Sequence, residues 1–173
     1  MEGIIYIDNF IENASELFTQ LSTEVKWDES MIARKTASYG IPYNYSQITY
    51  VHQAFPPSLE VILDKLEAIL GFKPNNCLLN YYANGKSKMG FHSDRIDNLV
   101  ENTGIAIISL GESRILRFRN IENKENLVDF ELKAGSLVFM TIALQKEWKH
   151  AIPKSDTERG RISLTFRKLL VSD

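Results

Sequence analysis

A histidine and an aspartate lie two residues apart in the stretch GFHSDRID, which runs from Gly90 to Asp97. In a β-strand, side chains two residues apart point to the same side, so His92 and Asp94 would project together. Imidazole and carboxylate are both metal ligands. The stretch is therefore a candidate for two thirds of a metal site, although a His-x-Asp pair in a strand also commonly forms an ordinary hydrogen bond.

A third metal ligand would have to come from elsewhere, and His52 and His150 are the only other histidines. His150 follows Asp94 by 56 residues and lies in a different strand candidate. Neighbouring strands of a sheet lie about 4.8 Å apart, so a residue that is distant in sequence can meet the pair. Two histidines and one carboxylate would form the facial triad of non-haem Fe(II) oxygenases, which leaves positions on the metal open.

The segment RISLTFR places polar residues on one side of a strand and apolar residues on the other. Its polar side could face solvent. Alternatively, Arg161 and Arg167 could reach inward from both ends toward a small dicarboxylate, because guanidinium donors match carboxylate oxygens. The segment LLNYYA has the same alternation, and its Asn80 and Tyr82 would add neutral donors on one side.

The elements that would position these residues are mostly short strands. Helices are predicted near residues 13–25 and 58–71, with Ser58 as a plausible N-cap and Gly71 as the end of the second helix. Strands are predicted at 4–7, 77–83, 90–94, 104–110, 114–119, 127–132, 136–141, 148–152 and 161–169. This order predicts a mainly β (α+β) fold, a sandwich or jelly roll with N-terminal helices packed on one sheet.

Length and composition indicate an ordinary globular protein. A chain of 173 residues fits a single domain over residues 1–173. Its net charge of −2 argues against a non-specific nucleic-acid coat, and its single cysteine, Cys77, fits a reducing compartment. No stretch resembles a signal peptide or approaches the roughly 20 apolar residues of a membrane span. We expect a cytoplasmic monomer that does not enter a membrane.

Four motifs, LLNYYANGKSKMGFHSD, GIAIISLG, EWKHAIPK and RISLTFR, together resemble the AlkB family of Fe(II)/2-oxoglutarate dioxygenases. The similarity runs from about Ala33 to Leu169. It implies a double-stranded β-helix, with a catalytic core over residues 77–169. It also implies Fe(II), 2-oxoglutarate and O2 as cofactor and cosubstrates, and hydroxylation of a C–H bond. When the hydroxylated carbon is attached to nitrogen, the N-alkyl group is lost as an aldehyde.

The resemblance also implies roles for individual residues. His92, Asp94 and His150 would be the catalytic iron ligands. Arg161, assisted by Tyr82, would bind the distal carboxylate of 2-oxoglutarate. The remaining cosubstrate contacts would be Asn80 and Arg167 near the iron-chelating end, and Ser163 where some members have asparagine. Every expected position is filled, which disfavours a catalytically inactive binding module.

The segment at residues 33–50 resembles the lid that recognises the nucleotide in nucleic-acid demethylases of this family. Aromatic side chains there could stack on an extruded base. In many such members the second residue after the metal-binding aspartate is acidic, whereas here it is isoleucine, and Asp97 could replace it only from a loop. The predicted substrate contacts are Arg34, Tyr39, Tyr43, Tyr45 and Ile96.

Two kinds of substrate therefore stay open. The lid-like segment and the basic C-terminal part favour dealkylation of single-stranded or flipped-out DNA or RNA. The negative net charge and Ile96 favour hydroxylation or demethylation of a protein side chain or a small metabolite.

Overall fold

The computed structural model describes residues 1–44 and 48–171. Two longer helices precede most of the strands, and a one-turn helix lies near the C-terminal end. These are α1 (Ala14–Glu24), α2 (Pro57–Leu70) and α3 (Leu144–Glu147). The strands are β1 (Ile4–Ile7), β2 (Lys35–Gly40), β3 (Asn76–Tyr82), β4 (Met89–His92), β5 (Gly104–Gly111), β6 (Arg114–Asn120), β7 (Leu127–Leu132), β8 (Leu137–Thr141), β9 (Trp148–Ile152) and β10 (Arg161–Arg167).

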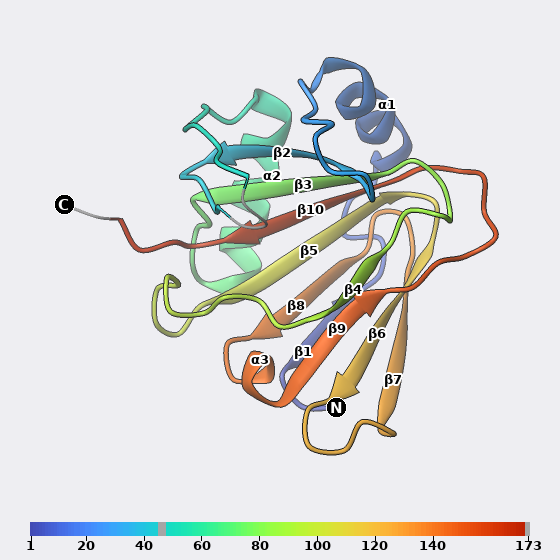
Figure 1. The fold of residues 1–173 in the computed structure, drawn as a ribbon. Coiled ribbons are helices and arrows are strands. Elements are labelled where there is room, and N and C mark those ends of the chain that lie inside the picture. The colour runs from blue at the N-terminus through green and yellow to red at the C-terminus, as the bar shows by residue number, and fades with distance from the viewer. Residues whose placement is uncertain (45–47, 172–173) are drawn as a thin grey trace.

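The strands form two antiparallel sheets. The larger sheet has the order β1-β8-β5-β10-β3-β2, and the smaller has the order β4-β9-β6-β7. Figure 1 shows α1 and α2 gathered at the part of the larger sheet formed by β2, β3 and β10, away from β6 and β7. This arrangement confirms the predicted jelly roll with helices packed on one sheet. No helix in the described part of the chain is long and apolar enough to cross a membrane.

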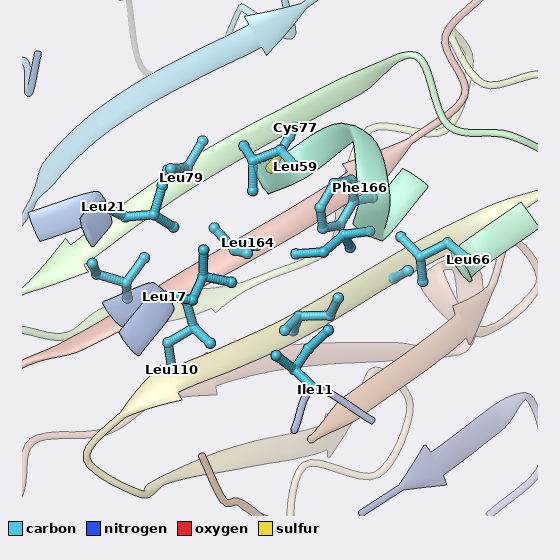
Figure 2. Close-up of a cluster of buried hydrophobic side chains, with 14 of the residues drawn as sticks. Ile11, Leu17, Leu21, Leu59, Leu66, Cys77, Leu79, Leu110, Leu164 and Phe166 are labelled. Atoms are coloured by element: carbon cyan, nitrogen blue, oxygen red, sulfur yellow. The ribbon is translucent and has the colours of Figure 1, made fainter. Parts of the chain in front are cut away.

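One hydrophobic core lies between the helices and the larger sheet. Leucines of α1 and α2 pack there against alternate residues of β3, β5 and β10 (Figure 2). Leu164 and Phe166 of β10 are fully buried in this core, as the alternation in RISLTFR requires. A second core fills the space between the two sheets, where Phe118, Leu116 and Ile105 are buried.

The ends of α2 only partly follow the expectation. Gly71 adopts a left-handed conformation with φ of 80° and ends the helix, as predicted. The predicted N-cap at Ser58 is wrong, because the helix begins one residue earlier and Pro56 occupies the N-cap position. Proline at the first helical position lacks an N–H that would otherwise be unpaired there, so Pro57 replaces a side-chain cap.

An edge strand inside the lid-like segment was not predicted. β2 pairs with β3 along residues 35–40. Gly40 has φ of 74° and lies against the backbone oxygen of Asn75, where a larger residue would not fit. The strand was hidden because its small and polar residues are buried by neighbouring strands rather than arranged in an alternating pattern.

Candidate active site

One face of the larger sheet forms the wall of a cavity of about 450 Å³ between the two sheets. Arg161, Ser163, Thr165 and Arg167 of β10 and Leu78, Asn80 and Tyr82 of β3 all border this cavity. β10 lies between β3 and β5, with Arg161 opposite Tyr82 and Ser163 opposite Asn80. The polar side of RISLTFR is therefore buried, and the alternative that it faces solvent is wrong.

Two histidines and one aspartate meet across the cavity from this wall. His92 at the end of β4 lies directly opposite His150 on β9. The carboxylate oxygen Oδ1 of Asp94 lies 3.3 Å from Nε2 of His92 and 3.3 Å from Nε2 of His150. One ligand atom from each residue lies within 4.8 Å of the other two. The exposed His52 does not belong to this cluster.

The cluster fits a six-coordinate metal ion. Adjacent ligand atoms at about 2.1 Å from an octahedral ion are about 3 Å apart, close to the separations found here. Burial lowers the pKa of His150, which favours the neutral imidazole that binds metals. His92 stays partly open to solvent on the cavity side. Three protein ligands on one side of such an ion leave coordination positions on its other side for a cosubstrate.

Asp94 is held by residues from two other elements. β4 ends at His92, so strand alternation does not bring Asp94 to the cluster, contrary to our prediction. Its backbone N–H donates to Oε1 of Gln145 at 2.8 Å, and its Oδ2 accepts from Nη2 of Arg167 at 2.5 Å. Burial alone would raise the pKa of this carboxyl, but Arg167 and the two histidines hold that pKa well below its usual range.

Gln145 was not identified from the sequence, and we expect it to be needed for tight metal binding. Replacing it with leucine, which has a similar size, leaves the buried N–H of Asp94 without an acceptor. Outer-shell changes of this kind lower metal affinity by roughly 10- to 100-fold. The iron concentration that supports half-maximal 2-oxoglutarate turnover should rise accordingly in Gln145→Leu. The neighbouring exposed Lys146→Ala is the control, and an unchanged iron dependence in Gln145→Leu would contradict this role.

Arg161 lies at the other end of the cavity, 1% exposed. Its Nη2 donates to the hydroxyl of Ser109 at 3.0 Å, and its guanidinium lies 5.1 Å from the ring centre of Tyr82. Its Nε and Nη1 are buried without hydrogen-bond partners, and no carboxylate of residues 1–44 or 48–171 pairs with it. Burial lowers the pKa of this group. A buried cation with unused donors facing a cavity is suited to a carboxylate.

A second arginine, which the sequence analysis did not single out, lies behind Tyr82. Arg114 is 2% exposed, and its guanidinium carbon lies 5.6 Å from the centre of the Tyr82 ring. Its Nη atoms donate to the backbone oxygens of Asn84 at 3.3 Å, Ser87 at 2.8 Å and Pro153 at 2.7 Å. Arg114 thereby fastens the β3–β4 connection to the end of β9, and it adds positive charge behind the Arg161 end of the cavity.

The expectation that Arg161 and Arg167 act together on one dicarboxylate stays a prediction. In both arginines Nε and Nη1 are buried without hydrogen-bond partners among the described residues. Arg167 forms an ion pair with Asp94, and its guanidinium lies 3.9 Å from the ring centre of Tyr43. Arg167 therefore neutralises Asp94 and holds its carboxylate in place. Asn80 borders the cavity, as expected, and its Oδ1 accepts from Nε of Arg34 at 2.8 Å.

The predicted substrate contacts divide into three groups. Arg34 and Tyr43 border the cavity, and the hydroxyl of Tyr43 accepts from the backbone N–H of Arg95 at 3.2 Å. Tyr39 does not border the cavity, because strand alternation turns its side chain to the helix side of β2, where it packs near Phe55. Tyr45 lies outside the described residues.

Ile96, the last predicted substrate contact, does not border the cavity. Ile96 packs against the second core rather than on the cavity wall. Its neighbour Arg95 borders the cavity and forms a bidentate ion pair with Asp97, with distances of 2.5 and 3.1 Å. The carboxylate of Asp97 is thus engaged by Arg95, and it is not part of the cavity wall.

A jelly roll with an inward-facing His–Asp–His cluster and a buried guanidinium that has unused donors defines a class, the 2-oxoglutarate-dependent non-haem iron dioxygenases. The family model described as the 2OG-Fe(II) oxygenase superfamily matches residues 3–167. Fe(II), 2-oxoglutarate and O2 are accordingly the cofactor and cosubstrates of this chain.

Curated relatives narrow the assignment within this class of enzymes. An uncharacterized protein, R406 of Acanthamoeba polyphaga mimivirus, is 32% identical, over 92% of this chain and 83% of its own length. The DNA oxidative demethylase ALKBH2 of Mus musculus is 30% identical, over 92% of this chain and 72% of its length. The alpha-ketoglutarate-dependent dioxygenase alkB homolog 3 of Bos taurus is 32% identical, over 91% of this chain and 62% of its own length.

The structure of OsALKBH1 has the same fold. It matches 97% of this chain and 99% of its own with a TM-score of 0.72, at 12% identity. The chain described here belongs to the AlkB family of Fe(II)/2-oxoglutarate dioxygenases. It spans 65% of the length of bovine ALKBH2 and 62% of the length of bovine alkB homolog 3.

Proposed function

We propose that this protein removes alkyl groups oxidatively from N-alkylated bases of DNA or RNA. The observation that carries the proposal is the meeting of His92, Asp94 and His150 at one end of a cavity whose other end holds the unpaired cation Arg161. This arrangement suits a metal ion and a dicarboxylate side by side, with space remaining above them. The names of the relatives, which include a DNA oxidative demethylase, support bases as the substrate.

In this proposal His92, Asp94 and His150 hold Fe(II). Iron with 2-oxoglutarate and O2 supplies the oxidation of a C–H bond, and the protein supplies position and the exclusion of water. Arg167 keeps Asp94 ionised, and Gln145 fixes the backbone of Asp94. His150 lies against Phe118 in the second core, which would keep water away from that side of a bound metal ion.

The cosubstrate would occupy the wall formed by β3 and β10. Arg161 would bind its distal carboxylate through the donors that have no other partner. Tyr82 would assist, and Ser109, opposite Ser163 on β5, orients the guanidinium. Asn80 and Arg167, which both border the cavity, would contact the iron-chelating end of the cosubstrate. Ser163 lies between Arg161 and Arg167 on β10 and would add a further contact.

The alkylated base would enter beside Arg34 and Tyr43, both of which border the cavity. A cavity of about 450 Å³ is within the range of about 300–1,000 Å³ that small-molecule sites occupy. Tyr43 is stacked on Arg167, so we assign it to the floor of the base site rather than to a mobile cover.

We further propose that residues 1–173 act as one domain, as a monomer in the cytoplasm.

Turnover of methylated oligonucleotides tests the proposal. Extruding a base from a duplex costs a few kcal/mol, so we expect single-stranded substrates to react faster than the same sequence in a duplex. Succinate release should exceed the uncoupled background with 1-methyladenine or 3-methylcytosine in a single strand. Formaldehyde should appear in an amount equal to that excess of succinate. The unmethylated strand is the control.

A screen of methylated peptides and small metabolites under the same conditions addresses the other substrate classes. Stimulation by one of these, with none by any methylated oligonucleotide, would contradict the proposal. It would leave the dioxygenase class intact and move the substrate to a protein or a metabolite.

A further inference from the structure

Two cations lie directly opposite one another on the outer face of the smaller sheet. Arg119 of β6 pairs in register with Lys149 of β9, one position from the pair formed by Phe118 and His150. Phe118 and His150 are buried toward the cavity side, so Arg119 and Lys149 point away from it. Like charges in directly opposite positions repel and lower the stability of a sheet. Such a pair is therefore unfavourable unless an anion binds to it.

The part of the chain that the structure describes provides no such anion. Leu127 lies opposite Arg119 on its other side. Among residues 1–44 and 48–171, no carboxylate lies within ion-pair distance of Arg119 or Lys149. Arg117, two residues earlier on the same face, differs in this respect. It lies opposite Asp129 and binds that carboxylate through two hydrogen bonds of 2.8 Å.

The two cations are connected to the active site through Phe91. The guanidinium carbon of Arg119 lies 4.0 Å from the centre of the Phe91 ring. Phe91 precedes the cluster residue His92 on β4 and borders the cavity itself. A residue on the border of the cavity thereby contacts the guanidinium without using its hydrogen-bond donors. Ser93, on the other side of His92, donates to the backbone oxygen of Trp148, next to Lys149, at 3.1 Å.

We propose that Arg119 and Lys149 bind the phosphate backbone of the substrate strand next to the nucleotide that enters the cavity. This rests on the proposed function and adds a binding surface to it. Phosphate is the anion that flanks every nucleotide, and the planar donors of arginine match its oxygens. Backbone contacts of this kind position a strand without reading its sequence. The chain has a net charge of −2, so binding would depend on this local pair rather than on overall charge.

The test compares Arg119→Gln, Lys149→Gln and the double variant with the parent protein. Binding of a methylated single-stranded oligonucleotide is measured across a range of salt concentrations. Each phosphate contact that is lost should reduce the slope of log affinity against log salt by about 0.7. The double variant should therefore lose about 1.4 in slope and bind every sequence more weakly. Its KM for oligonucleotides should rise while its kcat stays unchanged.

Arg117→Gln is the matched control, because it removes a cation from the same strand and face that already has a carboxylate partner. Its salt slope should equal that of the parent. A free methylated nucleoside, which has no flanking phosphates, should be turned over equally by the parent and the double variant. Thermal unfolding of the double variant should occur at or above the parent temperature, since a repulsive pair has been removed.

The results that overturn the surface differ from those that overturn the function. The phosphate surface is refuted if the double variant keeps the affinity and salt slope of the parent. It is also refuted if Arg117→Gln loses as much affinity and salt slope as the double variant. In either case, oligonucleotide turnover by the parent stands. A parent protein that neither binds nor demethylates any oligonucleotide refutes the proposed function and the surface together.

Discussion

His92→Ala is expected to lose bound iron and to lower 2-oxoglutarate turnover by more than about 100-fold, the upper end of what the loss of an outer-shell partner costs a metal site. His92 supplies one of the three ligand atoms. Its side chain is 33% exposed, and its Nδ1 lies 2.9 Å from the backbone oxygen of Gly90. Removing it should therefore leave the fold intact. Iron content and succinate formation are measured on the same preparation, with thermal unfolding as the check on folding.

His92 is a better position for this test than Asp94. Removing the Asp94 carboxylate would leave Arg167 buried and unpaired, which typically costs about 3–5 kcal/mol, so lost activity could reflect unfolding. His52→Ala is the matched control, because His52 is exposed and is not among the cavity residues. Parent-like iron content in His92→Ala, or loss of iron in His52→Ala, would refute the assignment of the ligands.

Arg161→Met is expected to weaken 2-oxoglutarate binding severely while leaving the ligand-free protein at least as stable. Truncating one partner of a buried, hydrogen-bonded charge pair costs about 2–5 kcal/mol, or roughly 30- to 5,000-fold in affinity. Without the cosubstrate, however, Arg161 is a buried cation with no carboxylate partner in the described residues. Replacing it with methionine removes that desolvation cost and keeps most of the volume. Calorimetric titration with 2-oxoglutarate and thermal unfolding with and without it measure the two effects.

Two further variants sharpen this comparison. Arg161→Lys keeps a positive charge but loses the planar donors, so its affinity should fall between those of the parent and Arg161→Met. Arg117→Met removes a half-exposed arginine far from the cosubstrate wall and should bind 2-oxoglutarate as the parent does. If Arg161→Met binds 2-oxoglutarate with the parent's affinity, Arg161 does not bind the distal carboxylate.

The sequence by itself determined the features that depend on local periodicity. The alternation in RISLTFR and LLNYYA separates cavity residues from core residues along β10 and β3, because side chains of a strand point to opposite faces in turn. The same rule, with turn residues between the strands, predicted nine of the strands and the jelly roll. The resemblance of the four motifs to the AlkB family implied a metal site at His92, Asp94 and His150 before any of these residues could be placed in space.

Only the tertiary structure decided which distant residues meet. Gln145 reaches the backbone of Asp94 across 51 residues, and Arg167 reaches its carboxylate across 73. These contacts depend on which strands pair and on how the turns between them direct the chain, and no pattern of neighbouring residues in the sequence specifies either. The same limitation explains β2, Arg114 and the position of Ile96. In each case a neighbour from another part of the chain decides whether the residue is buried, paired or exposed, and a sequence read along one strand at a time does not contain that neighbour.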